Sequence, residues 1–344
     1  MSHLLKKINS DQVYFIAEMS ANHANNLDIA LRIVEEAAKA GADCLKVQTY
    51  TADSLTLDCD NDYFMIKGGL WDGQRLYDLY SDASMPWEWH EPIKKKCDEL
   101  GLDFLSTPFD EAAVDLLDDM GCDAYKIASF ELVDIPLIKY AASKGKTMIM
   151  STGMASLEDI QDAVDAAKET GNGDIVLLRC CSEYPADPKD MNLASIPDMK
   201  SRFGVHVGFS DHSMGYLADV AAAVLGARVI EKHFCLSHDI KTADSEFSMD
   251  PSEYCDMVVS VNNAIAAMGK PNYTPSEKEA KSLVFRRSIF ASADIKQGEV
   301  FTKENIRIIR PGYGLAPKFY STLLGRAAKQ TYHFGDPIPE DESC

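Results

Sequence analysis

Two histidines of this chain stand where a metal ion could be bound. His212 follows the apolar run "HVGFSD", and His233 lies at the end of "RVIEKH". Glu231 and His233 are two residues apart, so they lie on one side of a strand. Two imidazoles with a carboxylate suit Mn²⁺, Fe²⁺ or Zn²⁺ better than Ca²⁺. We therefore expect a metal site at His212, His233 and Glu231, although a lone histidine is more often an ordinary core residue.

The other histidines are weaker candidates for a functional role. His206 and His238 lie further from the ends of the apolar runs, and we expect no special role for them. His23 follows such an end, where it could contact a substrate or cap the next helix.

Two lysines lie inside apolar runs, Lys46 in "CLKVQTY" and Lys126 in "AYKIAS". A buried lysine without a partner is costly, so each is expected to meet an anion. The anion could be a ligand, or a carboxylate of the chain itself, such as Glu18, Glu131 or Glu231.

Hydroxyl side chains stand at the ends of several successive runs and could donate to a phosphate. They are Thr107, Ser129, Ser151 and Ser182. Lysines, hydroxyls and a metal in one place indicate a phosphorylated anion that meets a polar electrophile.

These residues are positioned by a repeated unit. Eight short β-rich runs alternate with amphipathic helical patterns. The runs span residues 14–20, 44–50, 103–109, 124–129, 147–152, 174–180, 206–211 and 228–234. Eight such units predict an α/β fold of the TIM (β/α)8 barrel type, whose chemistry sits at the carboxyl ends of the strands. The alternative, an open doubly wound sheet, is disfavoured because no Gly-rich turn follows the first run.

The remaining segments define the domain organisation. We expect a barrel over residues 1–268, a linker over 269–285 and a small β-rich domain over 286–344, which is short enough to bury little surface on its own. Residues 51–85 form an insertion on the catalytic face and are a candidate substrate-covering loop.

Composition excludes several classes of protein. The net charge of −20 over 344 residues disfavours nucleic acid and anionic membranes as partners. No apolar run is long enough to span a bilayer, and the first residues do not resemble a signal peptide, so a cytoplasmic location is expected. The nine cysteines form no CxxC pair, which disfavours disulfides and cysteine zinc sites.

The motifs at these positions resemble those of the sialic acid synthase family, in order and over nearly the whole chain. They are "FIAEMSANHANN", "LKVQTY", "FLSTPFD", "YKIAS", "STGMAS", "GFSDHSMG", "IEKHF" and "RPGYGLAP". The resemblance implies a TIM barrel with a C-terminal antifreeze-like (SAF) domain. It also implies a homodimer in which each small domain covers the partner's active site.

The resemblance further implies an activity. The family condenses phosphoenolpyruvate with the open-chain aldehyde of an N-acylated amino sugar, using Mn²⁺ or Mg²⁺. It implies that His212 and His233 hold the metal, whereas Glu231 either ligates it or orients a metal-bound water. The implied phosphoenolpyruvate-binding residues are Lys46, Thr107, Lys126, Ser129, Ser151, Ser182 and Ser210. The implied sugar-side or catalytic residues are Glu18, Gln48, Tyr184 and Asp244, with Arg310 donated by the partner's small domain.

Residues 63–90 resemble the pseudaminic acid branch of the family, whose sugar substrate is 2,4-diacetamido-2,4,6-trideoxy-L-altrose. Its 6-methyl group could pack on Trp71, Leu76, Tyr77 or Tyr80, unless these side chains only anchor the loop. The alternatives are N-acetylneuraminate or legionaminic acid synthesis by the same chemistry. More distant alternatives are a Schiff-base aldolase that uses Lys126, and an ice- or carbohydrate-binding role for the C-terminal domain.

Overall fold

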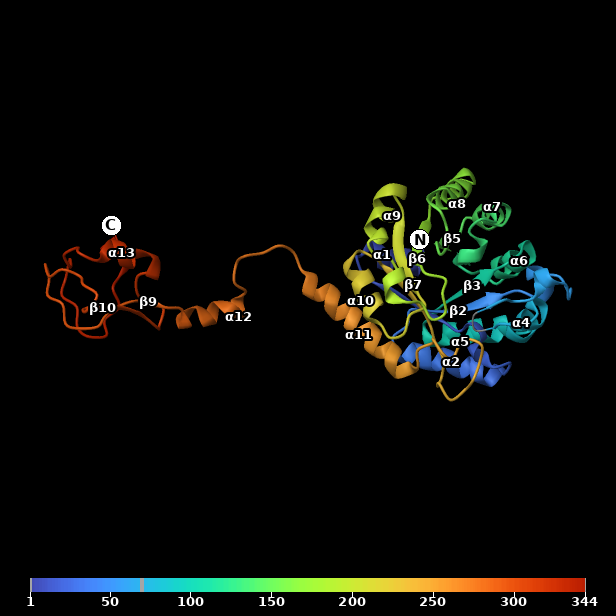
Figure 1. Cartoon of the computed structure of the whole chain (residues 1–344), viewed down its shortest axis with the longest axis horizontal. Coiled ribbons are helices and arrows are strands. Elements are labelled where there is room, and N and C mark those ends of the chain that lie inside the picture. Colours follow the sequence, from blue (N-terminus) through green and yellow to red (C-terminus); the bar gives the residue numbers. More distant parts are fainter. Residues whose placement is uncertain (1, 69–70, 344) are drawn as a thin grey trace. The chain divides into compact units, whose positions relative to one another are not determined.

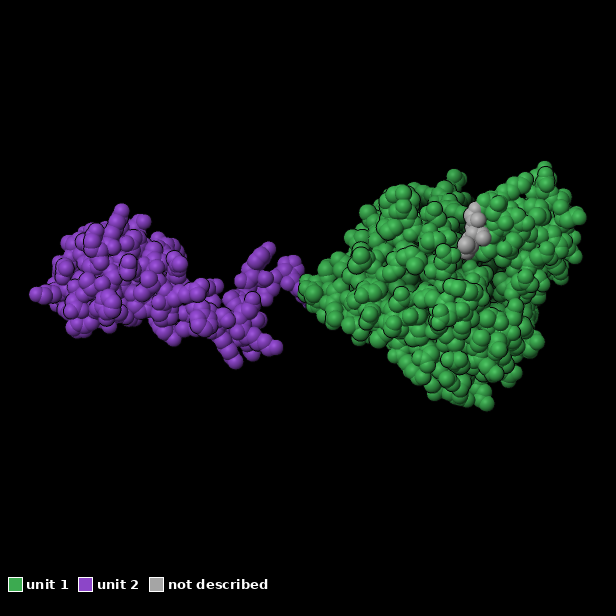
Figure 2. Space-filling model, turned by 60° about the horizontal axis from the view of Figure 1, so that its bottom comes forward, with its two compact units in different colours: residues 1–269 green, residues 270–344 purple. Residues whose placement is uncertain are grey.

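The chain folds into two compact units, residues 1–269 and residues 270–344, which Figure 2 shows in different colours. The computed structural model describes residues 2–68 and 71–343. Each unit has a hydrophobic core of its own and is described by itself.

The first unit is a parallel barrel, and each of the eight predicted runs forms one of its strands (Figure 1). The strands are β1 (Tyr14–Glu18), β2 (Cys44–Thr49), β3 (Asp103–Pro108), β4 (Ala124–Ile127), β5 (Thr147–Ser151), β6 (Ile175–Cys180), β7 (His206–Asp211) and β8 (Val229–His233). Their order, β3-β2-β1-β8-β7-β6-β5-β4, joins the first strand to the last. β3 and β4 end this order and lie against each other, so the barrel is nearly closed. The predicted TIM barrel is therefore confirmed, and the open sheet is excluded.

One helix follows every strand and covers its outer face (Figure 1). These helices are α2 (Leu27–Lys39), α5 (His90–Leu100), α6 (Glu111–Asp119), α7 (Ile135–Ser143), α8 (Leu157–Glu169), α9 (Ser195–Phe203), α10 (Leu217–Val224) and α11 (Pro251–Met268). Their starts are encoded locally. Ser156 and Asp250 form capping boxes before α8 and α11, and Asn26 and Asp110 cap α2 and α6 with their side chains.

The inside of the barrel is apolar at the amino end of the strands. Tyr14, Ile16, Leu105 and Leu178 are among the side chains that fill this layer. The short helix α1 (His3–Asn9) adds Leu4, Leu5 and Ile8 to it and so plugs the amino end of the barrel. Because the lower layer is filled by hydrocarbon, a cavity for chemistry can form only at the carboxyl end.

Gly208 is required by the packing of this interior. A Cβ atom at this inward position of β7 would lie 2.5 Å from Cδ2 of Leu178 and 2.5 Å from the carbonyl oxygen of Val229. Any larger residue would therefore push the neighbouring strands apart at the level just below the polar layer.

The insertion after β2 is partly helical. It contains α3 (Ala52–Leu55) and α4 (Leu76–Ala83), and Tyr80 of α4 packs edge to face on Tyr50 at the end of β2. The sequence indicated an insertion that could cover the substrate and made no prediction of helices within it. Two positions of the insertion, 69 and 70, lie outside the described residues.

The second unit begins with α12 (Glu277–Ala280), in the segment that the sequence indicated as a linker. Its strands β9 (Ser288–Ala291) and β10 (Ile306–Ile309) are antiparallel, and α13 (Tyr320–Leu323) follows them. Ten buried side chains, among them Ile289, Phe301 and Tyr332, form its core. The unit therefore has a small apolar core of its own. Among the described residues of the whole chain, no helix is long and apolar enough to cross a bilayer.

A buried histidine at the start of α5 is hydrogen-bonded to β2, and it should make the free energy of unfolding depend on pH. His90 Nε2 lies 2.6 Å from Thr49 Oγ1, and Nδ1 lies 3.0 Å from the Trp87 carbonyl oxygen, so Nδ1 carries the proton and donates it. Burial lowers the pKa of His90 from 6.5 to about 4. The unfolded chain therefore takes up a proton near pH 6.5, and the folded chain only near pH 4.

We therefore expect the free energy of unfolding to be complete above pH 6.5 and to fall as the pH drops towards 4. His90 should account for a loss of about 3 kcal/mol at most. Urea denaturation of the wild type and of His90→Gln at pH 7 and pH 4.5 measures this contribution. The variant should lose less stability between the two pH values, whereas His333→Gln, at an exposed site, should match the wild type. Equal pH dependence in all three proteins would contradict the assignment.

Candidate active site

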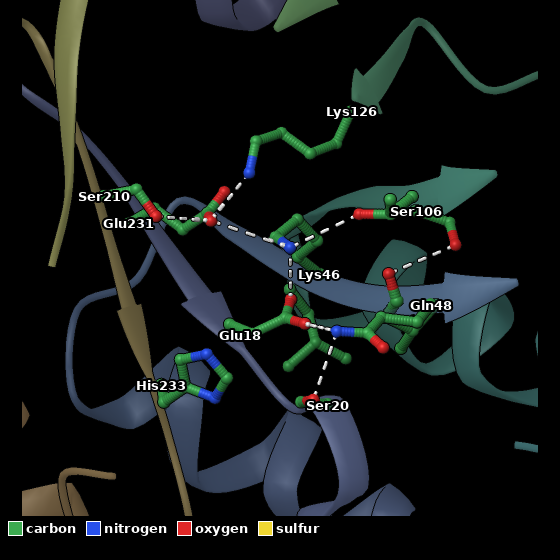
Figure 3. Close-up of polar contacts among 12 residues, drawn as sticks. Glu18, Ser20, Lys46, Gln48, Ser106, Lys126, Ser210, Glu231 and His233 are labelled. Atoms are coloured by element: carbon green, nitrogen blue, oxygen red, sulfur yellow. Dashed lines mark hydrogen bonds and ion pairs between the residues drawn. The ribbon is translucent and has the colours of Figure 1, made fainter. Parts of the chain in front are cut away.

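The carboxyl end of the barrel interior carries a layer of buried polar side chains (Figure 3). Because alternate residues of a strand point inward, the positions above the apolar layer are Glu18 on β1, Lys46 on β2, Lys126 on β4 and Glu231 on β8. Each of them is at most 5% exposed. The structure thus brings together four charged residues that the sequence placed at separate strand ends.

Two ion pairs connect these residues. Lys46 Nζ lies 2.9 Å from Glu18 Oε2, and Lys126 Nζ lies 2.8 Å from Glu231 Oε1. Lys46 Nζ is also 3.6 Å from Glu231 Oε1, and it donates to Thr107 Oγ1 at 3.4 Å. Ser210 Oγ donates to Glu231 Oε1 at 2.9 Å. Within the chain, both lysines therefore pair with the carboxylates of Glu18 and Glu231, two of the three that the sequence offered as partners.

The pKa values reflect this arrangement. Burial alone would raise the pKa of Glu231, but Lys126 and Lys46 outweigh burial and lower it to about 2. Burial lowers the pKa of Lys126, and it raises the pKa of Glu18 despite the attraction of Lys46. Glu231 is therefore the fixed anion of the layer, whereas Lys126 and Glu18 are the groups that a bound ligand can most readily perturb.

Hydroxyl groups gather beside Lys126. Ser129 Oγ accepts a hydrogen bond of 3.1 Å from the backbone N–H of Gly153, and Ser151 Oγ is buried without a hydrogen-bond partner among the described residues. A Cβ atom on Gly153 would lie 2.1 Å from Ser182 Oγ and 2.8 Å from Ser129 Oγ. The predicted hydroxyls of Ser129 and Ser182, which follow β4 and β6, therefore converge on Gly153, and the glycine leaves room for them.

The two histidines face each other across the rim. The centroids of the His212 and His233 rings are 5.4 Å apart, and Tyr184 covers His212 at 4.3 Å. Nδ1 of His212 lies 2.9 Å from the carbonyl oxygen of Cys181, and donation to that oxygen leaves Nε2 as a lone-pair donor. Burial and the neighbouring His212 lower the pKa of His233 well below its usual range, so its ring is neutral. Burial lowers the pKa of His212, but Cys180 and the carbonyl oxygen of Cys181 outweigh burial and raise it. His233 is thus the ring that offers a neutral imidazole to a cation.

His233 and Asp244 present donor atoms that a divalent metal ion could use, but the ligand atoms of the predicted set, His212, His233 and Glu231, do not all lie within 4.8 Å of one another. Nδ1 of His233 is buried and has no hydrogen-bond partner among the described residues. It lies 3.9 Å from Asp244 Oδ2, which is too long for a hydrogen bond but compatible with two ligand atoms about 2.1 Å from one ion. Oε2 of Glu231 also lacks a hydrogen-bond partner there, whereas its Oε1 is occupied by Lys126 and Ser210.

A second group of ligand types lies elsewhere. Among the described residues, three His, Cys, Asp or Glu ligand atoms lie within 4.8 Å of one another only at His238, Asp250 and Glu253. Asp250 and Glu253 already form the capping box of α11, and His238 Nε2 lies 3.1 Å from Glu253 Oε2. These groups have partners within the chain, so they do not require a metal.

Further polar and aromatic groups lie next to the charged layer and the histidines. Gln48 Nε2 donates to Glu18 Oε1 and to Ser20 Oγ, both at 3.1 Å (Figure 3). Asp244 Oδ2 accepts a hydrogen bond of 3.1 Å from the N–H of Ala21, in the loop after β1. Phe247 packs on both Tyr184 and His233, at 5.2 and 5.0 Å.

The aromatic residues of the insertion have separate positions. The Trp71 ring lies 6.2 Å from that of Tyr184 and thus reaches the site. Tyr77 instead packs under the guanidinium of Arg75, within the insertion itself, and Tyr80 packs on Tyr50, where it anchors the insertion to the barrel. Both interpretations of the insertion thus have support, each for different residues.

Three further residues named in the sequence analysis have surroundings of their own. Arg310 belongs to the second unit and is exposed, and no hydrogen bond or ion pair engages its guanidinium within the described parts of the chain. His206 begins β7, away from the carboxyl end, and His23 is buried beside Trp89 with its Nδ1 accepting from the N–H of Asn25.

Sequence reasoning did not single out Gly153, Ser20 or Phe247. Gly153 lies in the quoted motif "STGMAS", directly after a strand end, and a glycine at that place is a usable signal of close approach. Ser20 and Phe247 carry no such signal, because their roles depend on loops that meet only in the folded barrel.

Comparison with known proteins is consistent with this site and defines its class. The NeuB family model matches residues 33–273, and the SAF domain model matches residues 286–342. The chain therefore belongs to the NeuB family, as the sequence motifs indicated.

Individual relatives refine this placement. Pseudaminic acid synthase of Campylobacter jejuni is 47% identical over 97% of this chain and 98% of its own. N,N'-diacetyllegionaminic acid synthase of Legionella pneumophila is 35% identical over 91% of this chain and 89% of its own. The crystal structure of N-acetylneuraminic acid synthetase from Leptospira borgpetersenii, in complex with citrate, is 30% identical. It has a TM-score of 0.70 and covers 79% of this chain and 90% of its own.

Proposed function

We propose that this protein is a pseudaminic acid synthase. It would condense phosphoenolpyruvate and water with 2,4-diacetamido-2,4,6-trideoxy-L-altrose to give pseudaminic acid and phosphate. The observation that carries the proposal is the buried layer of Lys46, Lys126, Glu18 and Glu231 beside two facing histidines. It lies in a chain that is 47% identical, from end to end, to an enzyme of that name.

The cations of the layer would bind phosphoenolpyruvate. Lys126 and Lys46 have only carboxylate and hydroxyl partners in this structure, and a phosphate or carboxylate of the substrate could share these ammonium groups. Ser129, Ser151 and Ser182 would add neutral donors, and Gly153 would leave room for the phosphate oxygens. Thr107 and Ser210 hold Lys46 and Glu231 in place.

The condensation forms a bond between C3 of phosphoenolpyruvate and the aldehyde carbon, and positive charge then develops at C2. Water adds at C2, and phosphate leaves by cleavage of its C–O bond. Glu18, held by Lys46 and Gln48, is the carboxylate that would stabilise the cationic centre. Tyr184, Asp244 and Gln48 would orient the sugar.

His212 and His233 would hold a divalent ion, Mn²⁺ or Mg²⁺, with Asp244 within reach of it. Such an ion acts as a Lewis acid towards a carbonyl oxygen. The occupied Oε1 of Glu231 favours a role for this carboxylate in holding the lysines, and its unpaired Oε2 could orient a water molecule.

The sugar assignment rests on two observations. Identity to the pseudaminic acid enzyme exceeds that to the diacetyllegionaminic acid enzyme, 47% against 35%. Trp71, Tyr184 and Phe247 also place aromatic surface beside the histidines, which suits a sugar with a methyl group at C6.

Phosphate release from phosphoenolpyruvate with Mn²⁺ tests the function. The trideoxy-altrose derivative is compared with N-acetylmannosamine and with the legionaminic acid precursor. Release with the first sugar alone is expected. Release with either of the others alone would retain the chemistry and reassign the product, whereas release with none would refute the proposal.

We propose further that the protein is a homodimer in which the small unit of one chain covers the barrel of the other. Large apolar side chains are exposed in the loops and at the first helical residues after β4, β5 and β7, at the end of the barrel that holds the site. They are Phe130, Val133, Met154, Leu157, Met214 and Leu217. Residues 270–344 carry 12 Lys and Arg against 9 Asp and Glu, whereas residues 1–269 carry 22 against 45. A basic unit that meets an acidic barrel is electrostatically favourable.

Mixing two inactive variants tests the donated arginine. Arg310→Met lacks the arginine, and His212→Ala lacks a working barrel, so neither should turn over alone. In a mixed dimer the His212→Ala chain supplies Arg310 to the intact barrel of its partner. Re-equilibrated equal mixtures should regain roughly a quarter of wild-type activity, from random pairing in a twofold dimer. No recovery, in mixtures shown to exchange subunits, would exclude donation between chains.

We also propose that the protein acts in the cytoplasm. The cysteines at the eight described positions are all free thiols, which suits a reducing compartment.

A further inference from the structure

A second buried charge cluster lies outside the active site, on the outer face of β7 and β8. Asp211 and Lys232 are partners across these two strands, and Asp219 approaches them from α10. The three side chains are at most 1% exposed. The proposed chemistry uses none of them, so the burial of three ionisable groups here needs another explanation.

Lys232 uses its ammonium group to join β8 to the turn that follows β7. Its Nζ lies 2.5 Å from Asp211 Oδ2, 2.6 Å from the carbonyl oxygen of Ser213 and 2.9 Å from that of Gly215. Asp211 in turn accepts hydrogen bonds from the N–H and the hydroxyl of Ser213, at 2.8 and 2.9 Å. The three ammonium protons thus have three acceptors, and the turn is fixed at several points.

The place of these two residues in the sequence connects the cluster to the site. Asp211 directly precedes His212, and Lys232 directly precedes His233. Because successive side chains of a strand point to opposite faces, the ion pair lies behind the strands while the histidines face the barrel mouth. A shift of β7 against β8, or of the turn at 213–215, would therefore change the distance between the two imidazoles.

Asp219 provides an internal comparison. Asp219 Oδ2 lies 4.0 Å from Lys232 Nζ, and neither carboxylate oxygen of Asp219 has a hydrogen-bond partner in the described residues. Burial and the neighbouring Asp211 raise the pKa of Asp219 well above its usual range, so this carboxyl group is neutral. Asp219 shares the burial of the cluster but makes no bond to the turn.

We propose that the Asp211–Lys232 ion pair is a positioning element that sets the spacing of His212 and His233 and thereby the affinity of the protein for its divalent metal. This inference rests on the proposed function only in taking the two histidines as the metal ligands. Asp211 and Lys232 touch neither the metal nor the substrates. Groups that orient metal ligands from behind commonly change metal affinity by about 10- to 100-fold when they are replaced.

The test is Mn²⁺ binding to the full-length protein without substrates, measured by electron paramagnetic resonance of free Mn²⁺. Asp211→Asn/Lys232→Met removes both charges together, so no single charge stays buried, but it loses the bonds from Nζ to the turn. Its dissociation constant for Mn²⁺ should rise at least about 10-fold. Asp219→Asn, an isosteric change in the same cluster, should stay within about twofold of the wild type.

Ser213→Ala is a milder variant, and it tests the positioning role if the double variant does not fold. It keeps both charges and loses one hydrogen bond to Asp211, so Mn²⁺ binding should weaken about three- to fivefold. Wild-type affinity in the folded double variant, or in Ser213→Ala if the double variant does not fold, would overturn the proposal. Equal weakening in Asp219→Asn would overturn it too, since the effect would then be one of general packing.

His212→Ala separates this inference from the proposed function. If His212→Ala loses Mn²⁺ binding while the Asp211/Lys232 variant keeps it, only the positioning role is wrong. If His212→Ala keeps wild-type affinity, the histidine site itself is wrong, and the positioning role fails with it.

Discussion

Replacing His212 with alanine is expected to abolish both metal binding and turnover. The His212 ring offers Nε2 because Nδ1 is directed at the carbonyl oxygen of Cys181, and it faces the neutral ring of His233 at 5.4 Å. Without it a cation would keep one imidazole, and the carbonyl group of the aldehyde would lose several kcal/mol of charge stabilisation. We expect kcat to fall by roughly 1,000-fold or more.

The measurements are Mn²⁺ content after dialysis and phosphate release from phosphoenolpyruvate. His206→Ala is a matched control, because His206 lies on the same strand, β7, but at its opposite end. The control should bind metal and turn over like the wild type. Retained metal and activity in His212→Ala would show that the two histidines are not ligands.

Replacing Lys126 with methionine should impair the use of phosphoenolpyruvate and also destabilise the fold. Glu231, whose pKa Lys126 and Lys46 lower to about 2, would keep its buried charge but lose its nearest cation, at 2.8 Å. Breaking such a buried pair from one side costs about 3–5 kcal/mol. The free energy of unfolding should therefore fall by that amount, and kcat/KM for phosphoenolpyruvate by roughly 100-fold or more.

A double variant separates the two effects. Lys126→Met/Glu231→Gln removes both charges, so stability should recover while phosphoenolpyruvate use stays impaired. Urea denaturation and initial rates at varied phosphoenolpyruvate concentration measure each part. An unchanged KM and kcat in Lys126→Met would exclude Lys126 from the substrate site. Trapping of Lys126 on a substrate by borohydride would instead support the Schiff-base alternative.

Much of the barrel was predictable because its signals are local. Each of the eight runs became a strand, and the side chains of Asn26 and Ser156, which cap α2 and α8, show that the helix starts also depend on local signals. The period of two within a strand also decides which side chains enter the barrel. Glu231 and His233 therefore share a face, as do Lys46 and Gln48, and this follows from geometry that no tertiary contact can change.

The sequence alone could not show which carboxylate each buried lysine pairs with. Of the carboxylates that the sequence offered to Lys126, namely Glu18, Glu131 and Glu231, the structure pairs it with Glu231, which is 105 residues away on β8. The stagger of the closed barrel decides which inward side chains reach the same level, and no local pattern encodes that stagger.

The sequence by itself thus determined the fold class, the end of the barrel where chemistry occurs and the residue types available there, because periodicity and capping act over a few residues. Only the tertiary structure decided that the hydroxyls of Ser129 and Ser182 converge over Gly153, and that Lys232 lies behind the two histidines with Asp211. These contacts join segments that become adjacent only after the strands have paired and the barrel has nearly closed. They depend on distances of a few ångströms, which the closure of the barrel sets.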